Sequence, residues 1–120
     1  MEQISPYKKD NEVLNLSFRF ALDIIAYTEK LEEAKRYNMA NQLFRSGTSI
    51  HANIREAQNA ESKDDFIHKM KVAAKEAEET EGWLLLCKHS PSYPAVDNLL
   101  DILTPILKIL NKIIGSSKRN

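Results

Sequence analysis

A chain of 120 residues with 42% hydrophobic and 28% charged residues has the composition of one folded domain and is too short for a second core. Its 17 basic residues balance its 17 acidic residues, which excludes the strongly basic surface typical of domains that bind nucleic acid through many phosphates. A single cysteine excludes an internal disulfide, and no apolar run approaches the roughly 20 residues needed to cross a bilayer, so we expect a cytoplasmic protein with no membrane partner.

The chain has few residues that interrupt helices. Only three glycines and four prolines occur, which favours long helices over a many-stranded sheet. Apolar residues at three-and-four spacing predict an all-α fold, an antiparallel up-down four-helix bundle. The helices are expected at about 12–33, 35–60, 63–89 and 95–114, in one domain with mobile tails at 1–9 and 115–120.

The first two predicted helices carry local signals at specific residues. Asn11 precedes the first apolar stripe and is expected to cap that helix. Gly47 lies within the apolar stripe of the second helix, where glycine costs about 1 kcal/mol relative to alanine. We therefore expect a neighbouring helix to approach closely at Gly47.

The second helix also has a polar stripe at helical spacing. Its members are Gln42, Arg45, Ser46, Ser49, Asn53 and Glu56. The third helix, which starts after the predicted N-cap Ser62, has a companion face of Lys69, Val72, Glu76, Glu79 and Trp83. Because the connection is short, the two helices are antiparallel neighbours, and Arg45 lies level with Glu76 and Glu79. We predict a partly shielded ion pair that fixes the helix register; the alternatives are solvated charges or a functional contact.

The fourth predicted helix has an unusually wide apolar surface. Its aliphatic residues fill an arc of roughly 180°, whereas a helix facing only its own bundle needs a stripe of roughly 100°. We therefore predict self-association through this helix, unless the first helix covers the extra width. The expected interface residues are Ile102, Ile106, Ile109 and Ile113.

A proline falls within the fourth helix. Pro105 removes one backbone hydrogen bond and is expected to kink the helix. Alternatively, Thr104 caps a new helix that starts at Pro105. Towards its end the chain is basic, with Lys108, Lys112, Lys118 and Arg119; the helix dipole favours such residues by itself, so they are a weak signal for RNA.

No residue pattern predicts catalysis, a metal or a cofactor. Ser49 and His51 are two apart, so their side chains point about 200° away from each other on one helix and cannot act as nucleophile and base. A hydrolase would need a serine and a histidine from different helices in one cleft. His51, His68 and His89 lack metal-ligand spacing, and Cys87 has no second cysteine, so surface histidines and a packed cysteine are expected.

The segment from Arg45 to Leu86 resembles a known family. It contains R-S-x-x-S-I-x-x-N-I-x-E-A, then D-F and E-x-x-E-T-x-x-W-L. This pattern is similar to that of the four-helix bundle proteins related to those encoded in intervening sequences of 23S ribosomal RNA genes. The resemblance implies a set of signature polar positions: Arg45, Ser46, Ser49, Asn53, Glu56, Glu76 and Glu79.

For most members of the same family no biochemical activity is assigned. Relatives include the accessory protein of diversity-generating retroelements, a barrel-shaped homopentamer that associates with a reverse transcriptase and nucleic acid. For this chain it implies a ring-like homo-oligomer, by resemblance a pentamer. Our hypothesis is a non-enzymatic scaffold or adaptor for another macromolecule, with RNA or a ribonucleoprotein as the first class of partner. The alternative is a purely protein-binding assembly module with no nucleic-acid role.

Overall fold

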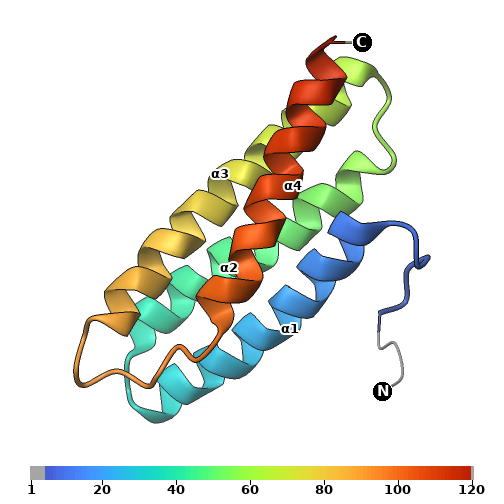
Figure 1. Ribbon diagram of the computed structural model, residues 1–120. Helices are drawn as coiled ribbons and strands as arrows, with labels where there is room; N and C mark the ends of the chain where they lie inside the picture. The colour runs from blue at the N-terminus through green and yellow to red at the C-terminus, as the bar shows by residue number, and fades with distance from the viewer. Residues whose placement is uncertain (1–4, 120) are drawn as a thin grey trace.

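Four amphipathic segments form the helices of a bundle in the computed structural model, which describes residues 5–119 (Figure 1). They are α1 (Glu12–Glu33), α2 (Tyr37–Ala57), α3 (Lys63–Lys88) and α4 (Leu99–Arg119). Successive helices run in opposite directions, and each packs against two others in the cyclic order α1, α2, α3, α4. The prediction of an all-α fold with four helices is confirmed.

Side-chain caps and one close contact were predicted correctly. The Asn11 side chain accepts a hydrogen bond from the Leu14 N–H at 3.4 Å, and Ser62 Oγ accepts one from the Asp65 N–H at 3.0 Å. A Cβ atom on Gly47 would lie 2.8 Å from Cγ2 of Ile24, which is fully buried. Glycine therefore permits the close approach of α1 and α2.

The ends of α2 differ from the prediction because the connections tighten. Lys35 adopts a left-handed conformation with φ of 61°, which turns the chain and delays the helix to Tyr37 instead of 35. At the other end α2 stops at Ala57 instead of 60, since the N–H groups of residues 58–60 donate to carbonyls three residues back.

The fourth helix is shifted along the chain relative to the prediction. It starts at Leu99 instead of 95, because Asp97 has φ of 51° and buried Val96 anchors the preceding loop. It ends at Arg119 instead of 114; residues 113–117 are half-buried, and their packing carries the helix through Gly115. The expected mobile tail is therefore helical at 115–119, while residue 120 lies outside the described residues.

The helix runs through Pro105 without a break. The Thr104 hydroxyl donates to the Leu100 carbonyl at 3.0 Å, so the alternative in which Thr104 caps a new helix is wrong. At the N-terminus, residues 1–4 of the predicted tail lie outside the described residues, while residues 5–9 lead into α1.

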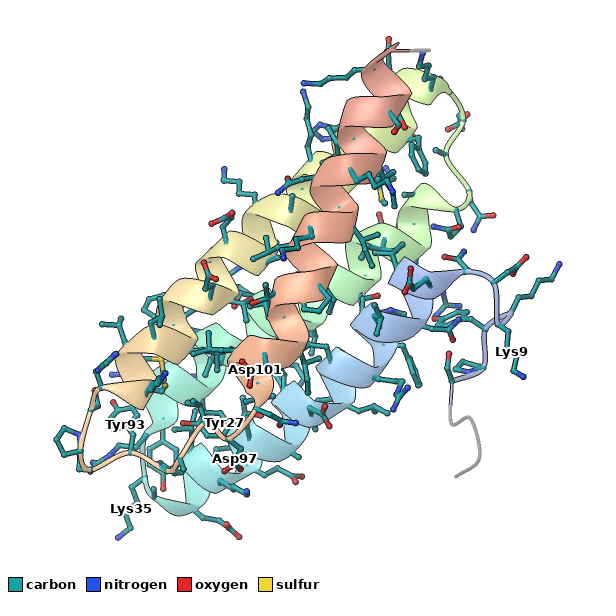
Figure 2. All side chains as sticks on the ribbon, viewed as in Figure 1. Lys9, Tyr27, Lys35, Tyr93, Asp97 and Asp101 are labelled. Atoms are coloured by element: carbon teal, nitrogen blue, oxygen red, sulfur yellow. The ribbon has the colours of Figure 1, made fainter. Side chains whose placement is uncertain are left out.

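The loop between α3 and α4 is held by tyrosines at one end of the bundle (Figure 2). The Tyr27 hydroxyl donates to the Pro94 carbonyl at 2.7 Å, and the Arg36 guanidinium lies 5.2 Å from the centre of the Tyr93 ring. Burial raises the pKa of Tyr27 well above its ordinary value, so this hydroxyl keeps the proton that it donates. Across residues 5–119, none of the helices combines the length and the hydropathy needed to span a membrane.

Candidate functional site

The predicted polar face lies between α2 and α3, and its centre is Arg45. The guanidinium donates from Nη1 to Glu76 Oε1 at 3.2 Å and from Nη2 to Glu79 Oε2. Trp83 Nε1 donates to the same Glu79 oxygen at 3.0 Å. The predicted ion pair between the helices is confirmed, with both glutamates as partners.

The ion pair is partly shielded from water. The Arg45 side chain is 49% exposed, that of Glu79 36% and that of Glu76 20%. Pairs fully in solvent contribute about 0–1 kcal/mol, and burial strengthens the attraction at the cost of desolvation. The cluster therefore sets the register of α2 and α3 more than it adds stability.

A buried hydroxyl pair lies directly beneath this cluster. Ser46 Oγ and Thr80 Oγ1 are hydrogen-bonded at 2.9 Å, and both residues are fully buried. The Thr80 hydroxyl donates its proton to the Glu76 carbonyl at 2.7 Å, so the Ser46 hydroxyl is the donor to Thr80. Sequence reasoning placed Ser46 in the polar stripe but missed Thr80, although Thr80 follows Glu76 by one turn and faces Ser46.

Three other signature positions do not join the cluster. Ser49 donates to the carbonyl of Arg45, and Asn53 donates to the carbonyl of Ser49, so both serve the backbone of α2. Glu56 is exposed, and its carboxylate makes no hydrogen bond or ion pair with the residues described. The signature therefore divides into an interhelical part and a part within α2.

A second polar group joins the N-terminal segment to the bundle. His51 Nδ1 lies 3.2 Å from Ser17 Oγ, and its Nε2 lies 2.9 Å from the Tyr7 hydroxyl. The Ser17 proton is donated to the Leu14 carbonyl, so Nδ1 carries the imidazole proton and Nε2 accepts from Tyr7. The Tyr7 and His51 rings both pack near Phe18.

A serine and a histidine from different helices thus meet, but without the geometry of a hydrolase. Ser17 is fully buried, and its hydroxyl proton is already bonded to a backbone carbonyl. Burial, and to a lesser extent the nearby Arg55, lower the pKa of His51. These contacts, which sequence reasoning missed, make His51 half-buried instead of a surface histidine and give it a structural role.

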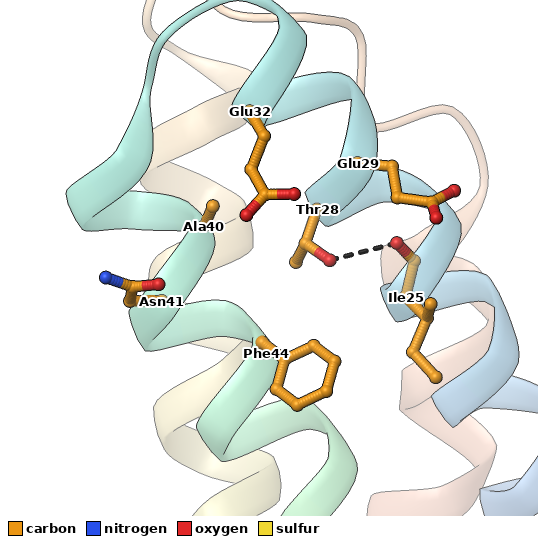
Figure 3. A pocket seen from close by; sticks show the side chains of 7 residues that line it. All are labelled: Ile25, Thr28, Glu29, Glu32, Ala40, Asn41 and Phe44. Carbon is orange, nitrogen blue, oxygen red and sulfur yellow. Dashed lines mark hydrogen bonds between the residues drawn. The ribbon is translucent and has the colours of Figure 1, made fainter.

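A surface pocket of about 360 Å³ lies between α1 and α2 (Figure 3). It is lined by Ile25, Thr28, Glu29, Glu32, Ala40, Asn41 and Phe44. The Thr28 hydroxyl donates to the Ile25 carbonyl at 2.9 Å, which leaves the two glutamates and the Asn41 amide as polar groups at its rim. The pocket offers negative charge beside an aromatic ring and no nucleophile.

The α4 interface prediction is wrong at one residue. Ile106 is fully buried in its own bundle, because it faces the core between α1 and α3. Ile102, Ile109 and Ile113 are half-buried and pack against the edge of the core. The large exposed apolar side chains lie on the other helices, at 39% to 56% exposure: Leu22, Tyr37, Phe44, Leu85 and Leu86.

The cysteine and the acidic residues do not assemble a metal site. Cys87 is buried as expected, and burial raises its pKa. Among residues 5–119, no three His, Cys, Asp or Glu side chains come together in a group that could hold a metal ion.

Comparison with known proteins relates the chain to one family. The family model of the 23S rRNA-intervening sequence protein matches residues 9–112. The chain is 42% identical to a crystal structure of a protein of unknown function from the S23 ribosomal protein family of Bacteroides thetaiotaomicron VPI-5482. That match has a TM-score of 0.81 and covers 85% of this chain and 97% of the other. No curated protein shows significant similarity.

Proposed function

Because the chain belongs to the 23S rRNA-intervening sequence protein family, we propose that it is a non-enzymatic, homo-oligomeric scaffold or adaptor. One observation carries the proposal: large apolar side chains, among them Phe44 and Leu86, stand about half exposed on the outer surface. Such a surface is typical of proteins that bury it against another protein. The family resemblance supports a ring, most simply a pentamer.

Light scattering tests self-association directly. The expected mass at micromolar concentration is a multiple of the 13.7 kDa chain. The contacts between copies of the chain should persist at high salt, because ions do little to weaken the burial of apolar surface. A mass of 13.7 kDa across the concentration range would overturn the proposal.

An association with RNA is supported by a local basic cluster. Lys118 lies beside Lys71, and this second ammonium lowers the pKa of Lys71, the expected effect of like charges held together. A phosphate would relieve the repulsion between the two. The chain as a whole carries no net charge, so RNA contact would be confined to such a patch.

Fluorescence anisotropy with a labelled single-stranded RNA at several salt concentrations tests this association. Affinity should fall with salt, and Lys71→Gln should reduce the slope of log affinity against log salt by about one phosphate contact. Lys88→Gln, at the opposite end of α3, is the matched control and should leave the slope unchanged. Absence of salt-dependent binding would leave the purely protein-binding module as the function.

A further inference from the structure

The outer face of α3 has a small apolar groove. It is formed by Glu79, Gly82, Trp83 and Leu86, which we call the α3 groove, and its volume is about 210 Å³. Trp83 is half-buried and is held in place by its hydrogen bond to Glu79, whereas Leu86 is 55% exposed. The groove therefore has one fixed aromatic wall and one aliphatic wall open to solvent.

The floor of this groove is a glycine that its own chain does not require. A Cβ on Gly82 would meet no atom within 4 Å, in contrast to Gly47, where Ile24 lies in contact. Glycine within a helix costs about 1 kcal/mol relative to alanine. No close contact within the chain explains why glycine, with its lower helix propensity, stands at position 82. We take this as a sign that a partner approaches the backbone of α3 at Gly82.

The same chain carries a row of isoleucines on the opposite side. Ile102, Ile109 and Ile113, the α4 edge, lie on one flank of the buried face of α4 at about 100° per residue, while Lys118 lies on the other flank, beside Lys71 of α3. The α4 edge therefore faces α1. The side between α1 and α4 is the most loosely packed of the bundle, and Figure 1 shows α4 diverging from α1 towards its C-terminus.

The positions of the two surfaces suit a ring. Since Glu79 pairs with Arg45 of α2, the α3 groove opens towards the α2–α3 side of the bundle. In the cyclic order of the helices, that side is opposite the α1–α4 side. A closed ring needs two different complementary patches on each subunit, pointing to its two neighbours.

The charges around the two surfaces are also complementary. Residues 75–83 of α3 contain four glutamates and one lysine. The part of α4 from Pro105 onward contains Lys108, Lys112, Lys118 and Arg119 and no acid. Neither Lys108 nor Lys112 forms an ion pair within the part of the chain that the structure describes. Both remain free to meet the acids of another copy.

We propose that the α4 edge of one copy docks into the α3 groove of the next, with an isoleucine seated over Gly82 between Trp83 and Leu86. This inference rests on the homo-oligomer proposed above and adds which two surfaces meet. The contact is head-to-tail: each copy offers its α4 edge to one neighbour and its α3 groove to the other.

Two variants and their mixture test the pairing. Gly82→Arg fills the groove from an exposed position, and Ile109→Lys places a charge on the α4 edge while its stem stays half-buried. Each variant alone should scatter light as a single chain of 13.7 kDa with unchanged helix content by circular dichroism. An equimolar mixture should form a dimer, because one variant keeps an intact α4 edge and the other an intact α3 groove.

Controls separate this inference from the proposed function. Leu22→Arg changes an exposed apolar residue outside both surfaces and should leave the oligomer mass unchanged. If the Leu22→Arg oligomer dissociates, the assignment of the contact to the α3 groove and the α4 edge is overturned. If the unmodified chain is an oligomer and Gly82→Arg keeps that mass, the groove is wrong and the homo-oligomer stands. If the mixture stays monomeric, the head-to-tail pairing is wrong. Should Ile109→Lys lose helix content, Ile102→Lys takes its place in the mixture.

Discussion

Replacing Gly47 and Gly82 by alanine should have opposite effects on the stability of the protein. At Gly47 the new methyl group would lie 2.8 Å and 2.9 Å from two carbons of Ile24, too close for carbon atoms in contact. Ile24 is fully buried, so its side chain cannot swing into solvent to make room. At Gly82 the same methyl group would meet nothing within 4 Å.

The magnitudes follow from two opposing effects. An extra methyl group forced into a packed core costs about 1–3 kcal/mol, and alanine gains about 1 kcal/mol over glycine in a helix. Gly47→Ala should therefore lower the free energy of unfolding by about 0–2 kcal/mol. Gly82→Ala should raise it by about 0.5–1 kcal/mol, since only the helix propensity changes.

Urea unfolding followed by circular dichroism measures both changes. The comparison is best made in the Ile109→Lys background, because self-association would otherwise add a concentration-dependent term to the stability. Equal slopes against urea would show that both variants unfold from the same native structure. If Gly47→Ala stabilises the protein as much as Gly82→Ala, the close approach of α1 and α2 is refuted.

Three further predictions concern the polar groups of the bundle. A double-mutant cycle between Arg45→Ala and Glu76→Gln should give a coupling of about 1 kcal/mol or less, because both side chains keep some exposure. Ser46→Ala should cost about 0.5–1.5 kcal/mol, because the buried Thr80 hydroxyl loses one hydrogen bond and keeps the other, to the Glu76 carbonyl; adding Thr80→Val should cost less than the sum of the two single changes. Because the pKa of His51 is lowered in the folded chain, this imidazole becomes protonated at a higher pH in the unfolded chain than in the folded one as the pH falls. The contribution of His51 to stability should therefore be complete above pH 6.5 and decrease below it. His51→Gln should remove this part of the pH dependence of Tm.

Each of these predictions has a control within the chain. Lys30 and Asp97 form an exposed pair at 3.9 Å, and their cycle should give a coupling near zero. If the coupling energy of Lys30 and Asp97 is as large as that of Arg45 and Glu76, the ion pair between α2 and α3 is not shielded from water. His68 is exposed on α3, and a pH dependence abolished by His68→Gln instead of His51→Gln would contradict the assignment. Strict additivity of the Ser46 and Thr80 changes would show that their hydroxyls do not interact.

The register of α2 and α3 could be predicted from the sequence because it depends on local signals. A short connection after Ala57 fixes the relative level of two antiparallel helices, which is enough to bring Arg45 to Glu76 and Glu79. The helix ends were less predictable. Left-handed Lys35 and Asp97 depend on the packing of the surrounding loops, and neither residue type requires that conformation.

Contacts between distant segments left no periodic pattern in the sequence. Tyr7 reaches His51 across 44 residues, and no spacing rule connects them. The wide apolar arc of α4 predicted that a large apolar surface of this helix is buried, but it did not predict which helices bury it. Because α1 and α3 both pack on α4, Ile106 is buried within the chain, while the aliphatic residues on both flanks of α4, among them Ile109 and Leu107, stay half-buried.

The signature ion pair and the α3 groove are parts of one arrangement. A single oxygen of Glu79 accepts hydrogen bonds from both Arg45 and Trp83, so the residue that sets the register of α2 and α3 also orients the aromatic wall of the groove. A surface ion pair adds little to stability, and neither an exposed glycine nor an exposed leucine adds to it. Glu79, Gly82 and Leu86 lie together on one side of the bundle, and the isolated fold does not need them there. A contact with another copy explains this grouping better, because a partner seated over Gly82 would bury Leu86 and shield Glu79 at once.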